Sequence, residues 1–160
     1  MHLQLAWILA VVMMKAGLVW AQAPPDPAQT AGQVPASPPY QPKFPGDPAR
    51  SESEAQALGY MRVVLRAEHE YKKRHDKFSD SLEALAGTGT FTKRMAHSTN
   101  RGDYTASFRV HQEGQNHDSF VLTMTPKQMD AEHRSFYAED DGAIHADDQK
   151  AADLSSPRVK

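Results

Sequence analysis

The stretch SESEAQALGYMRVVLRAEHEYKK, residues 51–73, decides the fold, because its apolar residues recur with the period of an α-helix. Ser51 and Glu54 have the S-x-x-E spacing of a capping box, and Pro48 lies upstream, where it cannot interrupt the helix. We therefore predict a helix from Glu54 to about Lys73, with one broad apolar face that needs another element to pack on. The apolar face comprises Ala57, Leu58, Tyr60, Met61, Val64, Leu65, Ala67 and Tyr71, and the opposite face comprises Arg62, Arg66, Glu70, Lys73 and Arg74.

A short second helix is predicted just after the first. Ser79 or Asp80 can cap its start, and Gly87 can end it. Its apolar residues would fold back onto the first helix. These residues are Phe78, Leu82 and Leu85.

From Gly87 onward the pattern becomes that of strands. Every second residue of 104–110 is apolar, which predicts a strand with one buried face. Further strands are predicted at 120–125, 136–138 and 143–145, with turns at 113–116 and 140–142. The predicted fold class is α+β, with an amphipathic helix and a short helix packed on a three- or four-stranded antiparallel meander.

The N-terminal segment is predicted to direct export. Residues 5–14 are ten consecutive apolar residues, the length of a signal-peptide core, and Val19-Trp20-Ala21 fits a cleavage site. We expect residues 1–21 to be a signal peptide and the protein to be periplasmic or extracellular. An uncleaved membrane anchor is the alternative, because Lys15 lies near one end of the apolar run and can reach the interface.

The next segment, residues 22–50, is predicted to be a disordered tether, because it holds nine of the eleven prolines. The folded domain is expected at 51–148 and a flexible tail at 149–160.

Composition excludes several classes of function. The chain has no cysteine, and so no disulfide, thiolate metal site or cysteine nucleophile. Its net charge of −2 gives no electrostatic basis for binding nucleic acid. A membrane is expected as a partner only if the N-terminal segment is uncleaved.

The layout also resembles a known family. Tyr71 lies near the end of the helix, Phe78 and the Leu-x-x-Leu segment 82–85 follow, and the aromatic strand in 135–144 leads into an acidic turn with glycine. This order is similar to the globular head of type IV pilin-like proteins, especially the pseudopilins of type II secretion. The resemblance covers about residues 55–148.

Two features of that family are missing. The chain has no prepilin-peptidase site, and the tether separates its apolar segment from the helix. The resemblance therefore implies a pilin-like head on a different tether, without filament assembly.

A calcium site is the metal hypothesis that the sequence allows. Some pseudopilin heads bind calcium in a C-terminal loop, and carboxylates are the ligands that calcium prefers. An acidic hairpin turn explains the same residues. The candidate ligands are Glu139, Asp140, Asp141, Asp147 and Asp148.

No other motif points to catalysis or to a cofactor. The eight histidines show neither H-x-x-x-H nor H-E-x-x-H spacing, and no nucleophile or phosphate-binding motif is present. Arg101-Gly102-Asp103 matches an adhesion tripeptide, but it also fits a turn before a strand.

We expect an exported, non-catalytic interaction or structural module, with protein partners in the cell envelope and no cofactor. One alternative is an N-terminally anchored envelope component associated with a pilus or a type II secretion system. The other is a small exported metal-binding protein or enzyme.

Overall fold

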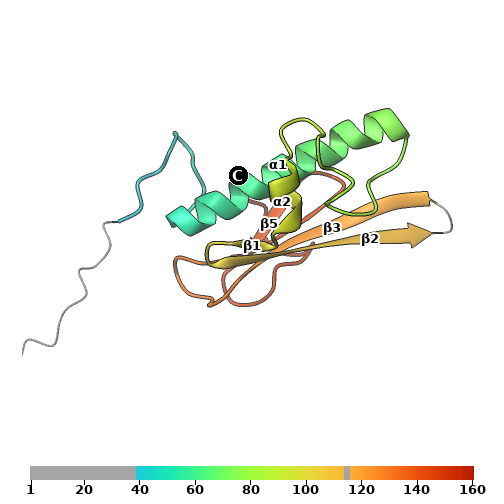
Figure 1. Ribbon diagram of the computed structural model, residues 1–160. Coiled ribbons are helices and arrows are strands. Elements are labelled where there is room, and N and C mark those ends of the chain that lie inside the picture. Colours follow the sequence, from blue (N-terminus) through green and yellow to red (C-terminus); the bar gives the residue numbers. More distant parts are fainter. Residues whose placement is uncertain (1–38, 114–115) are drawn as a thin grey trace, which may run out of the picture. The chain divides into compact units, whose positions relative to one another are not determined.

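The computed structural model describes residues 39–113 and 116–160. The predicted signal peptide, residues 1–21, and the tether as far as residue 38 lie outside the described residues. The described chain is an α+β domain in which one long helix packs against a five-stranded antiparallel sheet (Figure 1). Its elements are α1 (Glu52–His75), α2 (Lys93–His97), β1 (Asn100–Arg101), β2 (Tyr104–Glu113), β3 (Asn116–Pro126), β4 (Ser135–Glu139) and β5 (Ile144–Asp147).

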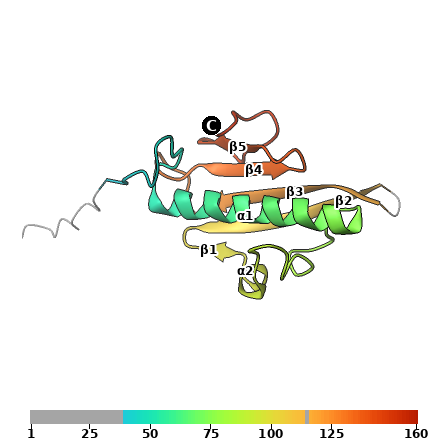
Figure 2. The same ribbon diagram turned by 90° about the horizontal axis from the view of Figure 1, so that it is seen from above.

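Helix α1 is the helix predicted from the repeat of apolar residues. Ser51 caps it, because its hydroxyl oxygen accepts a hydrogen bond from the Glu54 N–H at 3.1 Å. Seen from above, α1 runs along the sheet, with β4 and β5 on one side and β1 and α2 on the other (Figure 2). Within the described residues, no helix is both long enough and apolar enough to span a bilayer.

The sheet is a simple meander, with strands in the order β1-β2-β3-β4-β5. Alternation places one face of each strand in the core, as the period of two requires. Tyr104 and Ala106 of β2 are buried there, and β3 contributes Phe120, Leu122 and Met124. The β2–β3 register pairs Ala106 with Met124. The core is therefore a single layer between α1 and the sheet.

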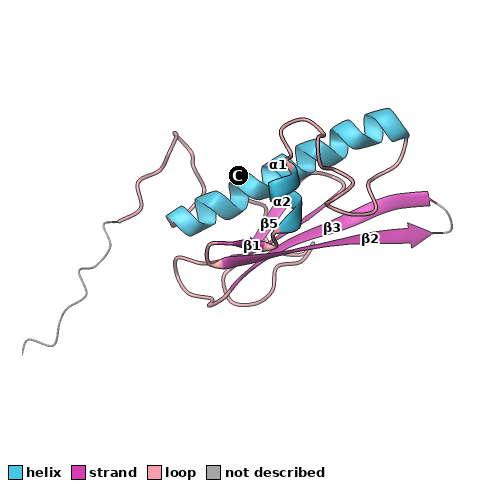
Figure 3. Ribbon diagram, in the orientation of Figure 1, coloured by secondary structure: helices cyan, strands magenta, loops and turns pink. Residues whose placement is uncertain are grey.

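The second helix is not where it was predicted. Residues 80–90 form consecutive turns (Figure 3), with bonds from the Leu85 N–H to the Leu82 carbonyl and from the Thr88 N–H to the Leu85 carbonyl. These are i to i+3 bonds, whereas an α-helix uses i to i+4. Leu82 and Leu85 are buried as expected, so the turns satisfy the apolar pattern without a helix. The second helix is instead α2, capped by Thr92.

The sheet has five strands rather than three or four. The additional strand, β1, is two residues long and pairs Asn100 with Thr105. Two residues cannot display an alternating pattern, so sequence periodicity gave no signal for this strand.

Residues 149–160 lie against β5 instead of forming a free tail. The Ala146 N–H donates to the Pro157 carbonyl at 2.9 Å, and the Val159 N–H donates to the Ile144 carbonyl at 2.8 Å. Ala152 is buried beside them. This segment covers the outer edge of β5, which would otherwise present unpaired backbone groups.

The described end of the tether also contacts the domain. Asp47 accepts hydrogen bonds from the Tyr40 hydroxyl at 2.6 Å and from the Lys43 N–H at 3.0 Å. Lys43 forms an ion pair with Glu52 at the start of α1. Residues 40–49 are thus folded against the helix, which moves the boundary of the domain toward the N-terminus.

Candidate functional site

A groove runs between the middle of α1 and the β4–β5 turn. It consists of two adjoining hollows of about 540 and 520 Å³, which share Leu65, Arg66 and Gly142 as lining residues. Gly142 is required at the turn, because its φ of 73° lies in the left-handed region, which favours glycine. The C-terminal segment closes one end with Val159. The groove, defined by these two hollows, is the candidate binding site.

The groove combines an apolar floor with a basic rim. The rim on α1 carries Arg62, Arg66 and Lys72, which all project into water. On the opposite wall, Arg158 forms a 2.9 Å ion pair with Asp141. The apolar lining comprises Leu65, Phe78, Phe120, Ala143, Ile144 and Val159.

Two of the rim cations contact aromatic rings rather than carboxylates. The Lys72 ammonium lies 4.1 Å from the centre of the Phe78 ring, and the Arg62 guanidinium lies 5.9 Å from that of Phe44. Such contacts orient a cation without neutralising it. Among the described residues, Arg66 forms no ion pair. The α1 side of the groove therefore keeps its positive charge.

A buried carboxyl group lies beneath one end of the groove. Glu68 is fully buried, and it accepts a 3.0 Å hydrogen bond from the Ser79 N–H. Burial raises the pKa of this carboxyl, while the hydrogen bonds from Ser79 act in the opposite direction. Within the described residues Glu68 forms no ion pair.

The hydroxyl group of Ser79 also contacts Glu68. It donates to Glu68 Oε1 and lies 3.1 Å from the Ser81 carbonyl oxygen. Burial outweighs the hydrogen bonds from Ser79 in setting the pKa of Glu68, so the net effect of this environment is to favour the neutral acid.

A second buried carboxylate lies at the start of α1. Glu54 Oε1 accepts from the Arg134 N–H at 2.8 Å and from Arg134 Nε at 3.0 Å. Glu54 Oε2 accepts from Arg134 Nη2 at 2.8 Å and from the Arg50 N–H at 2.9 Å. The expected capping box is therefore only half formed, because the carboxylate binds Arg50 and Arg134 instead of returning to Ser51.

Sequence reasoning missed the burial of Glu54 and Glu68. A signal for it exists, because both residues lie seven positions from the buried Met61 and so share its face of the helix. Arg134, the partner of Glu54, carries no comparable signal in its local sequence.

Two of the predicted calcium ligands at the β4–β5 turn have partners within the domain. Asp141 pairs with Arg158, as described above, and Glu139 accepts a hydrogen bond from the Tyr137 hydroxyl. In the part of the chain that the structure describes, no three His, Asp or Glu side chains gather at metal-binding distance. Asp140, the third candidate at this turn, is exposed and lines the groove. Calcium binding at the β4–β5 turn stays a prediction.

The remaining two candidates, Asp147 and Asp148, belong to the C-terminal side of the domain. Asp147 accepts from the Gln149 N–H at 2.9 Å and from the Lys150 N–H at 3.1 Å, and these bonds hold its pKa below the usual range. Asp148 lies 3.6 Å from the Arg50 guanidinium. Asp147 thus orders the chain that follows β5, which is a structural role.

The Arg101-Gly102-Asp103 tripeptide forms the turn that was predicted. Gly102 has a φ of 61°, and Asp103 accepts a 2.7 Å hydrogen bond from the Ser53 hydroxyl. The Arg101 guanidinium lies 4.1 Å from the centre of the Tyr60 ring. Both charged side chains are therefore engaged within the domain.

Comparisons with protein-family models, with curated proteins and with solved structures found no match to this chain.

Proposed function

We propose that this protein is an exported, non-catalytic interaction module that binds a protein partner through the groove between α1 and the β4–β5 turn. The observation that carries the proposal is the groove itself, which places apolar side chains beside three cations of α1 that form no ion pair within the described residues. Mixed surfaces of this kind suit a protein ligand, since apolar contact supplies affinity and charge selects the partner.

The pilin-like reading belongs to the same proposal. A long helix over an antiparallel meander is the layout on which the resemblance was based, and the α+β fold is compatible with it. In this view the head is the binding unit and the proline-rich segment is a spacer that holds it away from its point of attachment.

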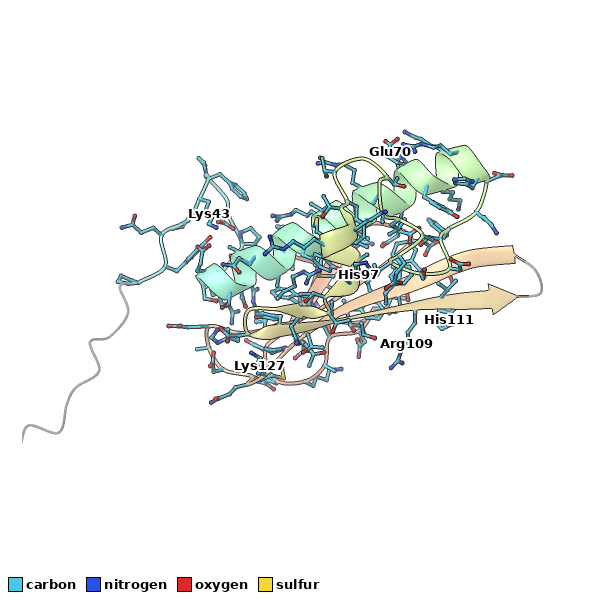
Figure 4. All side chains as sticks on the ribbon, in the orientation of Figure 1. Lys43, Glu70, His97, Arg109, His111 and Lys127 are labelled. Carbon is cyan, nitrogen blue, oxygen red and sulfur yellow. The ribbon has the colours of Figure 1, made fainter. Side chains whose placement is uncertain are left out.

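A photo-crosslinking experiment tests the groove as the binding site. Benzoylphenylalanine is placed at His69, which is exposed and lines the groove, or at His111, which lies on the far side of β2 from α1 (Figure 4). The two positions replace the same residue type on opposite sides of the domain. We expect a discrete crosslinked partner from position 69 and none from position 111, in the native exporting cell.

Equal labelling from both positions, or no labelling from position 69, would contradict the proposal. The mass and the first residue of the exported protein should be measured in the same cells. A soluble form beginning at Gln22 supports a released module. A membrane-bound form that retains residues 1–21 supports an anchored envelope component, and it makes residues 22–38 part of a stalk.

A further inference from the structure

We infer that the occupant of the groove is an extended, acidic segment of the partner protein, with apolar residues between its carboxylates. This inference rests on the proposed function and adds the chemistry of the partner. Three observations support it: the spacing of Arg62, Arg66 and Lys72 on α1, the absence of ion pairs to these three cations within the described residues, and the apolar lining between the two walls.

The spacing of the cations favours an extended polypeptide over a small anion. Arg62 and Arg66 are four residues apart on α1, which corresponds to about 6 Å along the helix axis. Alternate side chains of an extended chain are separated by about 6.6 Å. Lys72 is a further six residues along, or about 9 Å of axial rise, and it lies about 120° round the helix from Arg66, beside Phe78. One phosphate or carboxylate group cannot contact all three cations, whereas an extended peptide with several carboxylates can.

The charges on the two walls give the preferred sign. Three cations line the α1 wall, and Arg158 adds a fourth on the opposite wall. The acidic residues that line the groove are Asp141, which Arg158 already pairs, Asp140, and the buried Glu68 beneath the rim. The rim is thus positive overall in a chain whose net charge is −2. A basic segment would face this excess directly, so an acidic one is favoured.

The apolar lining indicates what lies between the carboxylates. Leu65, Ala143 and Val159 are each only partly buried, and they lie between the basic rim and the opposite wall. Leucine or valine side chains of the ligand would cover them and exclude water from the ion pairs, which strengthens those pairs. A purely acidic peptide lacks this contact and is expected to bind more weakly.

The test uses defined peptides and a matched pair of variants. The probe is a fluorescein-labelled eight-residue peptide in which glutamate alternates with leucine or valine, and its counterpart carries lysine in place of glutamate. Binding to the purified exported protein is followed by fluorescence anisotropy. Arg66→Glu reverses a charge in the groove, and Arg109→Glu makes the same change on the opposite face of the sheet (Figure 4).

We expect the glutamate peptide to bind and the lysine peptide not to bind. Arg66→Glu should weaken binding about tenfold, because it replaces an attraction by a repulsion, and Arg109→Glu should leave it within about twofold. The dissociation constant should rise with salt concentration. Thermal unfolding of both variants checks that they fold. Arg66→Ala only removes the charge, so its peptide dissociation constant should lie between those of Arg66→Glu and the native protein.

Three results would overturn the inference. The first is equal binding of the lysine and glutamate peptides, and the second is an equal effect of the two Arg→Glu variants. The third is that the protein binds phosphatidylglycerol vesicles in a way that Arg66→Glu abolishes, while Arg66→Glu leaves peptide binding unchanged. Crosslinking from position 69 distinguishes this failure from that of the proposed function. A crosslinked partner without glutamate-peptide binding refutes only the acidic segment, whereas absence of both refutes the binding groove as well.

Discussion

Replacing Glu54 by glutamine should destabilise the domain far more than the same replacement two residues earlier. The Glu54 side chain is 0% exposed and that of Arg134 is 14% exposed, so the ion pair is largely removed from water. Each carboxylate oxygen accepts two N–H groups. Whichever way a glutamine amide is oriented, its NH₂ group would face two of these donors.

The size of the loss in stability follows from the Arg134 charge, which would remain largely buried without its partner. Breaking a buried pair by removing one partner costs about 3–5 kcal/mol. Arg134 retains some contact with water, so we expect a loss near the lower end, about 3 kcal/mol. For a domain of this size, each kcal/mol lowers the midpoint of thermal unfolding by about 4 °C, which predicts a fall of about 12 °C.

Urea denaturation followed by circular dichroism measures the change, with Glu52→Gln as the control. Glu52 is also in the first turn of α1, but its ion pair with Lys43 is exposed, so a marginal change is expected. The m-value should stay constant if only the native state is affected. A loss for Glu54→Gln no larger than that for Glu52→Gln would refute the reasoning.

Four further variants probe other parts of the domain. Burial raises the pKa of Glu68 above its ordinary value of 4.5, so the folded state keeps this proton at pH values where the unfolded state has lost it. The stability that the neutral acid contributes is therefore complete below pH 4.5 and is lost as the pH rises through the pKa of the folded state. Glu68→Gln should therefore gain stability over the native protein with rising pH, as urea denaturation at several pH values would show; a difference independent of pH contradicts this. Deleting residues 157–160 removes two backbone hydrogen bonds and should cost about 2 kcal/mol and promote aggregation, measured by thermal unfolding and light scattering. Gly142→Ala should cost about 1 kcal/mol of stability because the φ of Gly142 is positive. Gly59→Ala should stabilise the domain by about the same amount, because Gly59 lies in the helix interior with open space around it. If calorimetry shows that both variants change the stability in the same direction, this account is wrong.

The elements that local pattern could predict are those with enough residues to show a period. The S-x-x-E start and the apolar repeat of 51–73 predicted α1, and the alternation in 104–110 predicted β2, both of which are confirmed. By contrast, α2 has five residues and β1 has two, which is too few for either period to be recognised.

The candidate site was less predictable because it depends on contacts across the sequence. The groove forms where α1 meets the β4–β5 turn, and Glu54 finds its partner 80 residues away in Arg134. No local pattern encodes such a meeting. The acidic turn was identified from sequence, but the ion pair between Asp141 and Arg158, which forms part of the groove wall, required the fold.

The two buried carboxyl groups of α1 have a consequence for how the helix is seated. An apolar stripe alone can slide along a sheet, because leucine, methionine and valine side chains interchange at modest cost. Glu54 and Glu68 lie near opposite ends of that stripe, and each has partners fixed by another part of the chain. Sliding α1 by one turn, about 5.4 Å, would separate Glu54 from Arg134 and Glu68 from Ser79 at once. Because the two buried acids lie at a fixed separation on α1, only one alignment of helix and sheet satisfies both. That alignment also places Arg62, Arg66 and Lys72 along the groove.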